Sequence, residues 1–188
     1  IDEVPDAQAA ELLDNLEPGE AASIVNDLDS DEATDVLAEM DREDVEEILS
    51  LMDADEAAEA RQLIDFDPES AGGLMMKEFL SYPGSTSVAD AVADVAVRGE
   101  EYPIYYLQHI FVVGPLGRLV GVAGLTDIAG AKPQTRLEEL ATPVDAINAS
   151  AGLDQLEEFF ESRDTPIAPV VDAAGRLLGA IRPRAVFD

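Results

Sequence analysis

The sequence predicts an α plus α+β fold, in which an all-α helical-repeat (superhelical) domain is followed by an α+β tandem repeat. Two repeats and one change in composition support this fold class. A twelve-residue pattern recurs through residues 16–63, and a hairpin pattern near residue 110 recurs 58 residues later. Residues 1–70 hold 25 acidic and two basic residues, whereas residues 71–188 hold 16 acidic and nine basic ones. We therefore expect two modules that meet near residue 70.

The helical module is predicted from four consecutive segments. Each opens with Leu or Met and then an acid, and each ends in an amphipathic helical pattern. Asp29, Asp41 and Asp53 stand where helix N-caps are expected, and Asp29 and Asp53 have capping-box spacing to acids three residues later. Because one helix of eight or nine residues cannot bury its apolar face alone, the units should stack. The segments are LEPGEAASIVND (16–27), LDSDEATDVLAE (28–39), MDREDVEEILSL (40–51) and MDADEAAEARQL (52–63).

Most of these acids are expected at helix starts and on solvated outer faces. Four aspartates from Asp27 to Asp35 fall at positions one, three, five and nine of an EF-hand loop. The sixth position is Glu32 instead of the turn glycine, and the twelfth is Ala38 instead of the bidentate glutamate, so we reject a calcium loop.

The second module is predicted from two segments that align without gaps, IFVVGPLGRLVGVAGLTDI (110–128) and APVVDAAGRLLGAIRPRAV (168–186). Each indicates a strand, a glycine-containing turn, a second strand and a short helix. An amphipathic helix precedes each, at residues 87–98 and 152–163, the first capped by Thr86 or Ser87.

The joint between the modules is DPESAGGLM (67–75). Asp67 and Pro68 are typical of an N-cap and a first helical position, and Gly72 and Gly73 allow tight backbone packing. The alternative is a plain linker.

Composition restricts the function. The net charge of −30 argues against nucleic acid and anionic membranes as partners. It favours cations, basic partners or a high-salt cytoplasm. The chain has no cysteine, and His109 has no second histidine or cysteine to complete a zinc site. No catalytic constellation is visible, so we expect no enzyme. No apolar run approaches the roughly 18 residues that a membrane-spanning helix needs.

The doubled VV…GRL.G hairpin, each copy preceded by a helix, is the pattern of paired cystathionine-β-synthase (CBS) motifs. Acidic helical repeats, DPESAGGLM, an IYY strand at 104–106 and two CBS motifs together resemble the cytosolic region of MgtE-type magnesium transporters. The resemblance implies a helical domain at residues 1–66, a linker and first CBS motif at 67–136, and a second CBS motif at 137–188. It also implies a cytoplasmic location, a homodimer formed through the CBS motifs, and a transmembrane pore domain as partner.

The resemblance further implies weak, regulatory Mg²⁺ binding between acidic surfaces. The family's metal-binding acids fall on Asp55, Glu59, Asp164 and Asp188. Two other family acids are replaced here, by Ser23 and by Ala185, and Arg184 could replace a metal-bridged contact with a direct salt bridge to the acidic domain.

Some family members bind adenine nucleotide (ATP or AMP) in the CBS cleft. Asp127 matches the nucleotide-binding carboxylate, but Gly124 replaces the usual Ser or Thr. The leading expectation is thus a magnesium-sensing regulatory module of a transporter. The alternatives are an adenine-nucleotide-sensing CBS module and a halophilic scaffold without a specific ligand.

Overall fold

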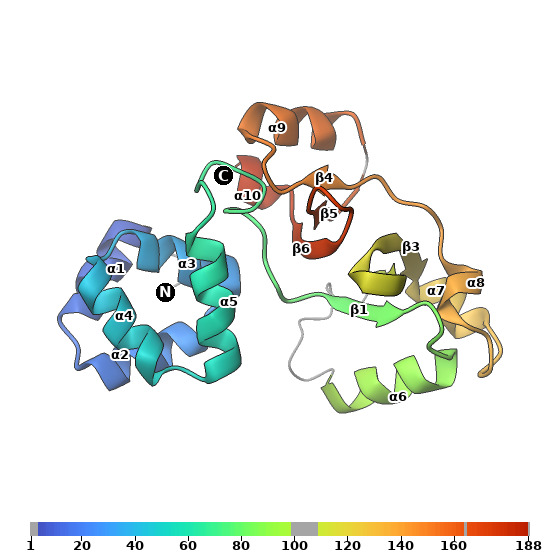
Figure 1. Cartoon of the computed structure of the whole chain (residues 1–188), viewed down its shortest axis with the longest axis horizontal. Coiled ribbons are helices and arrows are strands. Elements are labelled where there is room, and N and C mark those ends of the chain that lie inside the picture. Colours follow the sequence, from blue (N-terminus) through green and yellow to red (C-terminus); the bar gives the residue numbers. More distant parts are fainter. Residues whose placement is uncertain (1–3, 99–108, 164, 188) are drawn as a thin grey trace.

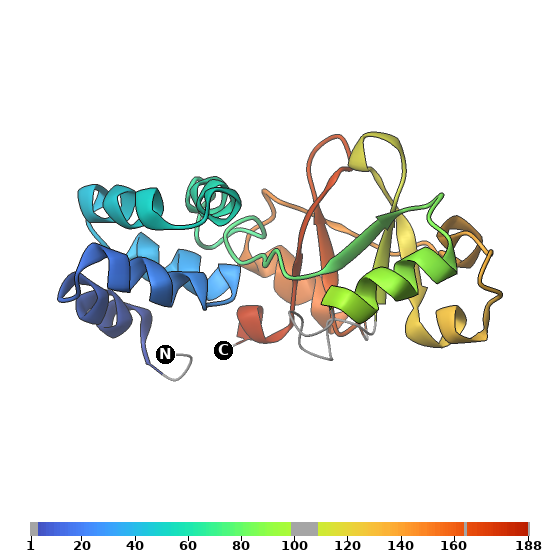
Figure 2. The same cartoon turned by 90° about the horizontal axis from the view of Figure 1, so that it is seen from below.

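The computed structural model describes residues 4–98, 109–163 and 165–187. A helical lobe lies beside an α/β lobe, and the two views in Figures 1 and 2 agree on this side-by-side arrangement. The segment between the two lobes runs directly from the last helix of the first into the first strand of the second. The predicted order of a helical domain followed by a tandem α/β repeat is confirmed.

The helical domain consists of five helices with one shared core. Helices α2 to α5 begin at residues 18, 30, 42 and 54, which is the predicted twelve-residue spacing. Helix α2 packs on α4, α3 on α5, and α1 on α3, so each helix buries its apolar face against the helix two units further along. The helices are α1 (Asp6–Asp14), α2 (Pro18–Asn26), α3 (Ser30–Ala38), α4 (Arg42–Leu51) and α5 (Ala54–Ile64).

Asp29, Asp41 and Asp53 occupy the N-cap positions of α3, α4 and α5, as predicted. None of the three carboxylates makes a side-chain cap hydrogen bond with its own helix, so the predicted capping boxes at Asp29 and Asp53 are wrong. At α3 the Asp29 carboxylate lies against an arginine of the second motif instead, and the amide of the first helical residue donates to another side chain.

The joint at residues 67–75 forms turns instead of a helix, so the predicted helix start at Asp67 is wrong. The Asp67 carboxylate accepts a hydrogen bond from the Glu69 amide (3.0 Å), and the Asp67 carbonyl oxygen accepts one from the Ser70 amide. This local bonding closes a turn in place of a first helical turn. The tight packing predicted for the glycines is confirmed, since a Cβ on Gly72 would overlap the Phe66 ring.

The α/β lobe contains two motifs of the same plan. The first motif comprises β1 (Leu80–Pro83), α6 (Val88–Arg98), β2 (His109–Val113), the 3-10 turn η2 (Pro115–Gly117), β3 (Leu119–Gly124), α7 (Leu125–Gly130) and α8 (Leu137–Leu140). The second motif comprises β4 (Ile147–Asn148), α9 (Leu153–Glu161), β5 (Ala168–Val171), β6 (Leu177–Ile181) and α10 (Arg184–Phe187). Ser87 caps α6, because its Oγ accepts the Asp90 amide at 3.1 Å.

Among the described residues, each motif has a three-stranded sheet with one parallel and one antiparallel pair, in the orders β1-β2-β3 and β4-β5-β6. Val112 pairs with Gly121 in the first sheet, and Val170 pairs with Gly179 in the second. These pairs occupy equivalent positions in the two aligned segments, so the tandem repeat is confirmed at the level of strand register. The strand expected at 104–106 lies outside the described residues.

The two motifs share buried contacts. Phe111 of the first sheet, Ala180 of the second sheet and Met76, which directly follows the joint, form one buried cluster. Leu156, Phe159 and Phe160 of α9 are buried in the core of the second motif. Over the described residues, no helix is long and apolar enough to cross a membrane.

Candidate functional site at the junction of the two lobes

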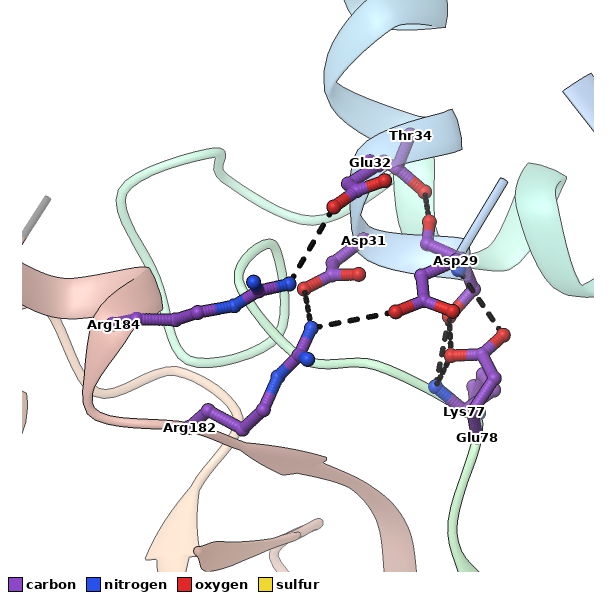
Figure 3. A network of polar contacts seen from close by, with 9 residues as sticks. Asp29, Asp31, Glu32, Thr34, Lys77, Glu78, Arg182 and Arg184 are labelled. Atoms are coloured by element: carbon purple, nitrogen blue, oxygen red, sulfur yellow. Dashed lines mark hydrogen bonds and ion pairs between the residues drawn. The ribbon is translucent and has the colours of Figure 1, made fainter. Parts of the chain in front are cut away.

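The first turn of α3 faces the second motif and the segment that leads into β1 (Figure 3). Glu78, just before β1, accepts hydrogen bonds from the Ser30 amide (3.1 Å) and the Ser30 hydroxyl (2.9 Å). The Ser30 Oγ in turn accepts the Lys77 amide at 2.8 Å. Burial raises the pKa of Glu78, and the hydrogen bonds from its own backbone and from Ser30 oppose that rise.

Two arginines of the second motif lie against the acids of the same turn. Arg182 Nη2 is 3.2 Å from Asp31 Oδ2 and 3.6 Å from Asp29 Oδ2. The Arg182 and Asp31 side chains are only 10% and 13% exposed. Arg184 Nη2 is 3.5 Å from Glu32 Oε1 in a more open pair. The direct salt bridge predicted for Arg184 is therefore confirmed, while the deeper pair made by Arg182 was missed.

A cavity of about 260 Å³, which we call the acidic cavity, is lined in part by Ser30. It is bordered by the end of α2, the start of α3, α5 and Glu78. The Asn26 Oδ1 atom at its edge is buried and accepts no hydrogen bond within the described residues. The carboxylates that line the cavity are Asp27, Asp29, Glu56, Glu59 and Glu78.

The electrostatics of the acidic cavity are those of crowded like charges. Partial burial raises the pKa of Glu56, and the neighbouring carboxylates of Asp53, Glu59 and Asp27 raise it further. A cation inside such a site would relieve this repulsion.

Of the predicted metal-binding residues, Glu59 lines the acidic cavity. Asp55 is exposed in the first turn of α5 and does not line it. Asp164 and Asp188 lie outside the described residues. Within the described residues, no three acidic or histidine side chains converge closely enough to hold a bare metal ion. Sequence reasoning missed Asp27 and Glu56, because acids occur at similar positions throughout the repeat.

None of the remaining predicted positions lines the acidic cavity. Asp127 is exposed in the first turn of α7, and its carboxylate lies over Gly124. Ser23 is exposed on α2, whereas Ala185 packs against the core of the second motif. His109 is half-buried at the start of β2.

Comparison with known proteins points to one family. The model of the MgtE intracellular N domain matches residues 1–69. The magnesium transporter MgtE of Thermus thermophilus is 29% identical over 123 residues, which are 65% of this chain. The chain spans only 27% of that protein's length.

Solved structures give the same result. The crystal structure of the cytosolic domain of the Mg²⁺ channel MgtE in complex with ATP matches with a TM-score of 0.79 and 28% identity, over 98% of this chain and 80% of that one. The soluble part of a magnesium transporter matches with a TM-score of 0.83 at 22% identity, over 98% and 77%. The CBS pair of a putative Mg²⁺ transporter from Shewanella oneidensis MR-1 shares the fold, with a TM-score of 0.63 at 18% identity over 87% and 94%. The chain is thus similar to the cytosolic domain of MgtE over nearly its whole length, with a match to the MgtE intracellular N domain at residues 1–69 and the fold of a CBS pair after it.

Proposed function

We propose that this chain is the regulatory module of an MgtE-like magnesium transporter, in which Mg²⁺ at the acidic junction controls how the helical domain docks on the CBS pair. The observation that carries the proposal is the acidic cavity, because it joins α5 and the start of α3 to Glu78 on the connecting segment. A cation there would tie the helical domain to the α/β lobe.

The donor set fits this ion. Mg²⁺ prefers oxygen ligands, usually keeps several waters and is held by one or two carboxylates. The cavity offers carboxylates and the Asn26 amide oxygen; its lining includes the weak thioether of Met52 but no thiolate or imidazole. Because no three described acids converge, the ion would bind with most of its water shell, in keeping with weak, regulatory affinity. Glu59 would supply a carboxylate inside the cavity, and Asp55, Asp164 and Asp188 remain proposed ligands from the family resemblance.

The physical basis of regulation is charge. The helical domain with its joint holds 25 acidic residues against two arginines. Repulsion within this domain and against other acids of the junction opposes docking, and a bound divalent cation offsets it. Docking would then follow the free Mg²⁺ concentration, and a pore domain elsewhere in the full-length transporter would receive the change. The proposal assigns no catalysis to this chain.

The test is small-angle scattering at fixed ionic strength, with MgCl₂ exchanged for NaCl. We expect the radius of gyration to fall in the millimolar Mg²⁺ range, and an unchanged radius would overturn the proposal. Glu56→Gln with Glu59→Gln should weaken the Mg²⁺ response, because it removes two cavity carboxylates. Glu43→Gln with Glu47→Gln, on the exposed surface of α4, is the matched control and should keep the response.

Adenine-nucleotide binding is a second candidate, favoured by the carboxylate at Asp127 and by the ATP complex of the structural relative. Calorimetry with ATP and with AMP at high potassium chloride tests it. Binding that is lost in Asp127→Asn would support a nucleotide site. No heat of binding from either nucleotide would leave magnesium as the regulatory ligand.

A further inference from the structure

The two lobes are joined by direct polar contacts that need no added ion. Among the described residues, these contacts meet at the start of α3: the two Glu78 contacts with Ser30, the Arg182 pairs with Asp29 and Asp31, and the Arg184 pair with Glu32. They come from the connecting segment, the residue after β6, and α10. Figure 3 shows the two guanidinium groups reaching the same helix end from the second motif.

The Arg182 pair is the central contact, because both of its side chains are largely excluded from water. Salt screens such a pair weakly, and removing one partner leaves a buried charge uncompensated. The Arg184 pair lies at the rim, with side chains 55% and 30% exposed, and a pair of this kind contributes little and is easily screened. The junction thus has a protected ionic centre and a weak edge.

The acids in this turn also suit their position. Carboxylates in the first turn of a helix are stabilised by the helix dipole, so α3 holds Asp31 and Glu32 in place before any partner arrives. The guanidinium groups then neutralise them across the junction. This part of the acidic surface therefore already has its counter-charges within the chain.

We propose that Arg182 and Arg184, together with Asp29, Asp31 and Glu32, form an arginine latch that keeps the helical domain docked on the second motif without a divalent cation. The latch sets the docked population from which any cation response begins. This inference goes beyond the proposed function and does not depend on cation sensing.

The closed and open states can be distinguished by a distance measured between two labels. The chain has no cysteine, so Ser50→Cys on α4 and Ser85→Cys after β1 give two unique label sites at exposed positions of the two lobes. Pulsed electron–electron double resonance between two spin labels measures the distance distribution in EDTA, at increasing concentrations of sodium chloride. We expect the labelled parent at low salt to give a major short-distance population and a smaller open one, and this open population is what Mg²⁺ would compact under the proposed function.

In Arg182→Gln we expect the docked-to-open ratio to fall by at least about tenfold, because Asp31 loses its buried partner. In Arg184→Gln the ratio should fall by less than about fivefold. Arg176→Gln is the matched control: it lies in the same motif and removes the same charge, but its partner Asp172 belongs to its own hairpin. It should behave like the parent.

A second route approaches the latch from the helical domain, in case an arginine variant folds poorly. Asp31→Asn keeps the side-chain shape and should also open the junction. In the Asp31→Asn background, Arg182→Gln should have a much smaller further effect, since the pair is already broken.

Two results would overturn the latch. One is an open, broad distribution for the labelled parent in EDTA at low salt. The other is an unchanged distance in the double variant Arg182→Gln/Arg184→Gln at every salt concentration up to about 1 M, where the Debye length is about 3 Å. In a separate experiment, the same distance is measured in the labelled parent as Mg²⁺ is added. Failure of the latch can therefore be distinguished from failure of cation sensing.

Discussion

Glu78 accepts both the backbone amide and the hydroxyl of Ser30, a residue 48 positions earlier in the chain. The amide belongs to the first residue of α3, so the helix cap that Asp29 does not provide comes from the segment leading into β1. The carboxylate of Asp29 is turned to Arg182 instead. The same contacts therefore satisfy the start of α3 and join the two lobes.

The first prediction follows from this shared cap. Ser30→Ala removes the hydroxyl that donates to Glu78 and accepts from the Lys77 amide, so it should lower stability by about 1–2 kcal/mol. Urea denaturation at neutral pH measures the change. Ser50→Ala is the control, because that exposed hydroxyl only donates to the Glu47 carbonyl of its own helix. Equal effects of the two substitutions would contradict a special role of Ser30.

The second prediction concerns pH. Burial, together with the charges of Asp6 and Asp31, raises the pKa of Asp35 from 3.8 to about 6. The folded state thus favours the protonated carboxyl, and this contribution to stability is present below about pH 4 and is lost as pH rises through about 6. Asp35→Asn should therefore be more stable than the parent at pH 7.5. We expect about 1 kcal/mol, well below the full shift, because the carboxyl is partly solvated.

Urea denaturation of the parent and of Asp35→Asn at several pH values checks this sign. The difference between the two proteins should grow between about pH 4 and pH 6 and then stay constant. Asp14→Asn, an exposed substitution on α1, serves as control. A stabilisation that is the same at pH 4 and pH 7.5 would show that ionisation of Asp35 is not its cause.

The third prediction concerns self-association. The family resemblance implies a homodimer formed through the CBS motifs. Leu156, Phe159 and Phe160 of α9 are buried within the second motif, so they cannot form its interface. Exposed apolar side chains lie instead on α6, where Val92 is 51% and Val97 is 81% exposed. If the chain dimerises through its CBS pair, Val92→Asp with Val97→Asp should weaken the dimer.

Light scattering over the micromolar range measures this change. Leu12→Asp, an exposed apolar position on α1, is the control and should leave the dimer intact. A monomeric parent at all these concentrations would contradict the expected homodimer.

Local patterns predicted the elements of this fold, but only in part the contacts between its lobes. The twelve-residue repeat predicted helix starts because burial of one helical face imposes a period on the sequence. The gapless alignment of the two hairpins predicted the common register of Val112–Gly121 and Val170–Gly179. The Glu78–Ser30 and Arg182–Asp31 contacts were missed, because they join residues 48 and 151 positions apart. A periodic sequence pattern does not predict contacts between residues that are so far apart in the chain.

The candidate site shows the same division. Glu59 and the Arg184 salt bridge were predicted from the family resemblance, which compares individual positions. No sequence feature distinguishes Glu56 as a site residue, since nearly every repeat has an acid at the start of its helix. Only the folded chain distinguishes the acids that line a cavity from those that face solvent.

The last prediction compares two equivalent glycines of the tandem repeat. A Cβ at Gly121 would overlap the backbone carbonyl of Thr142, which is itself held by hydrogen bonds to Val122. A Cβ at Gly179 would meet the flexible Met75 side chain, 2.6 Å from its sulfur. Backbone in a paired segment cannot move aside, whereas a methionine can change rotamer.

Gly121→Ala should therefore lower the free energy of unfolding by about 3 kcal/mol, and Gly179→Ala by only about 1 kcal/mol. Urea denaturation of the two variants, side by side, measures the difference. The strand register is equivalent at the two positions, so strand propensity affects both alike. If Gly179→Ala lowered stability as much as Gly121→Ala, the Met75 side chain would have to be held as rigidly as the Thr142 backbone. The double variant Gly179→Ala/Met75→Ala tests that reading. It should then be more stable than Met75→Ala alone.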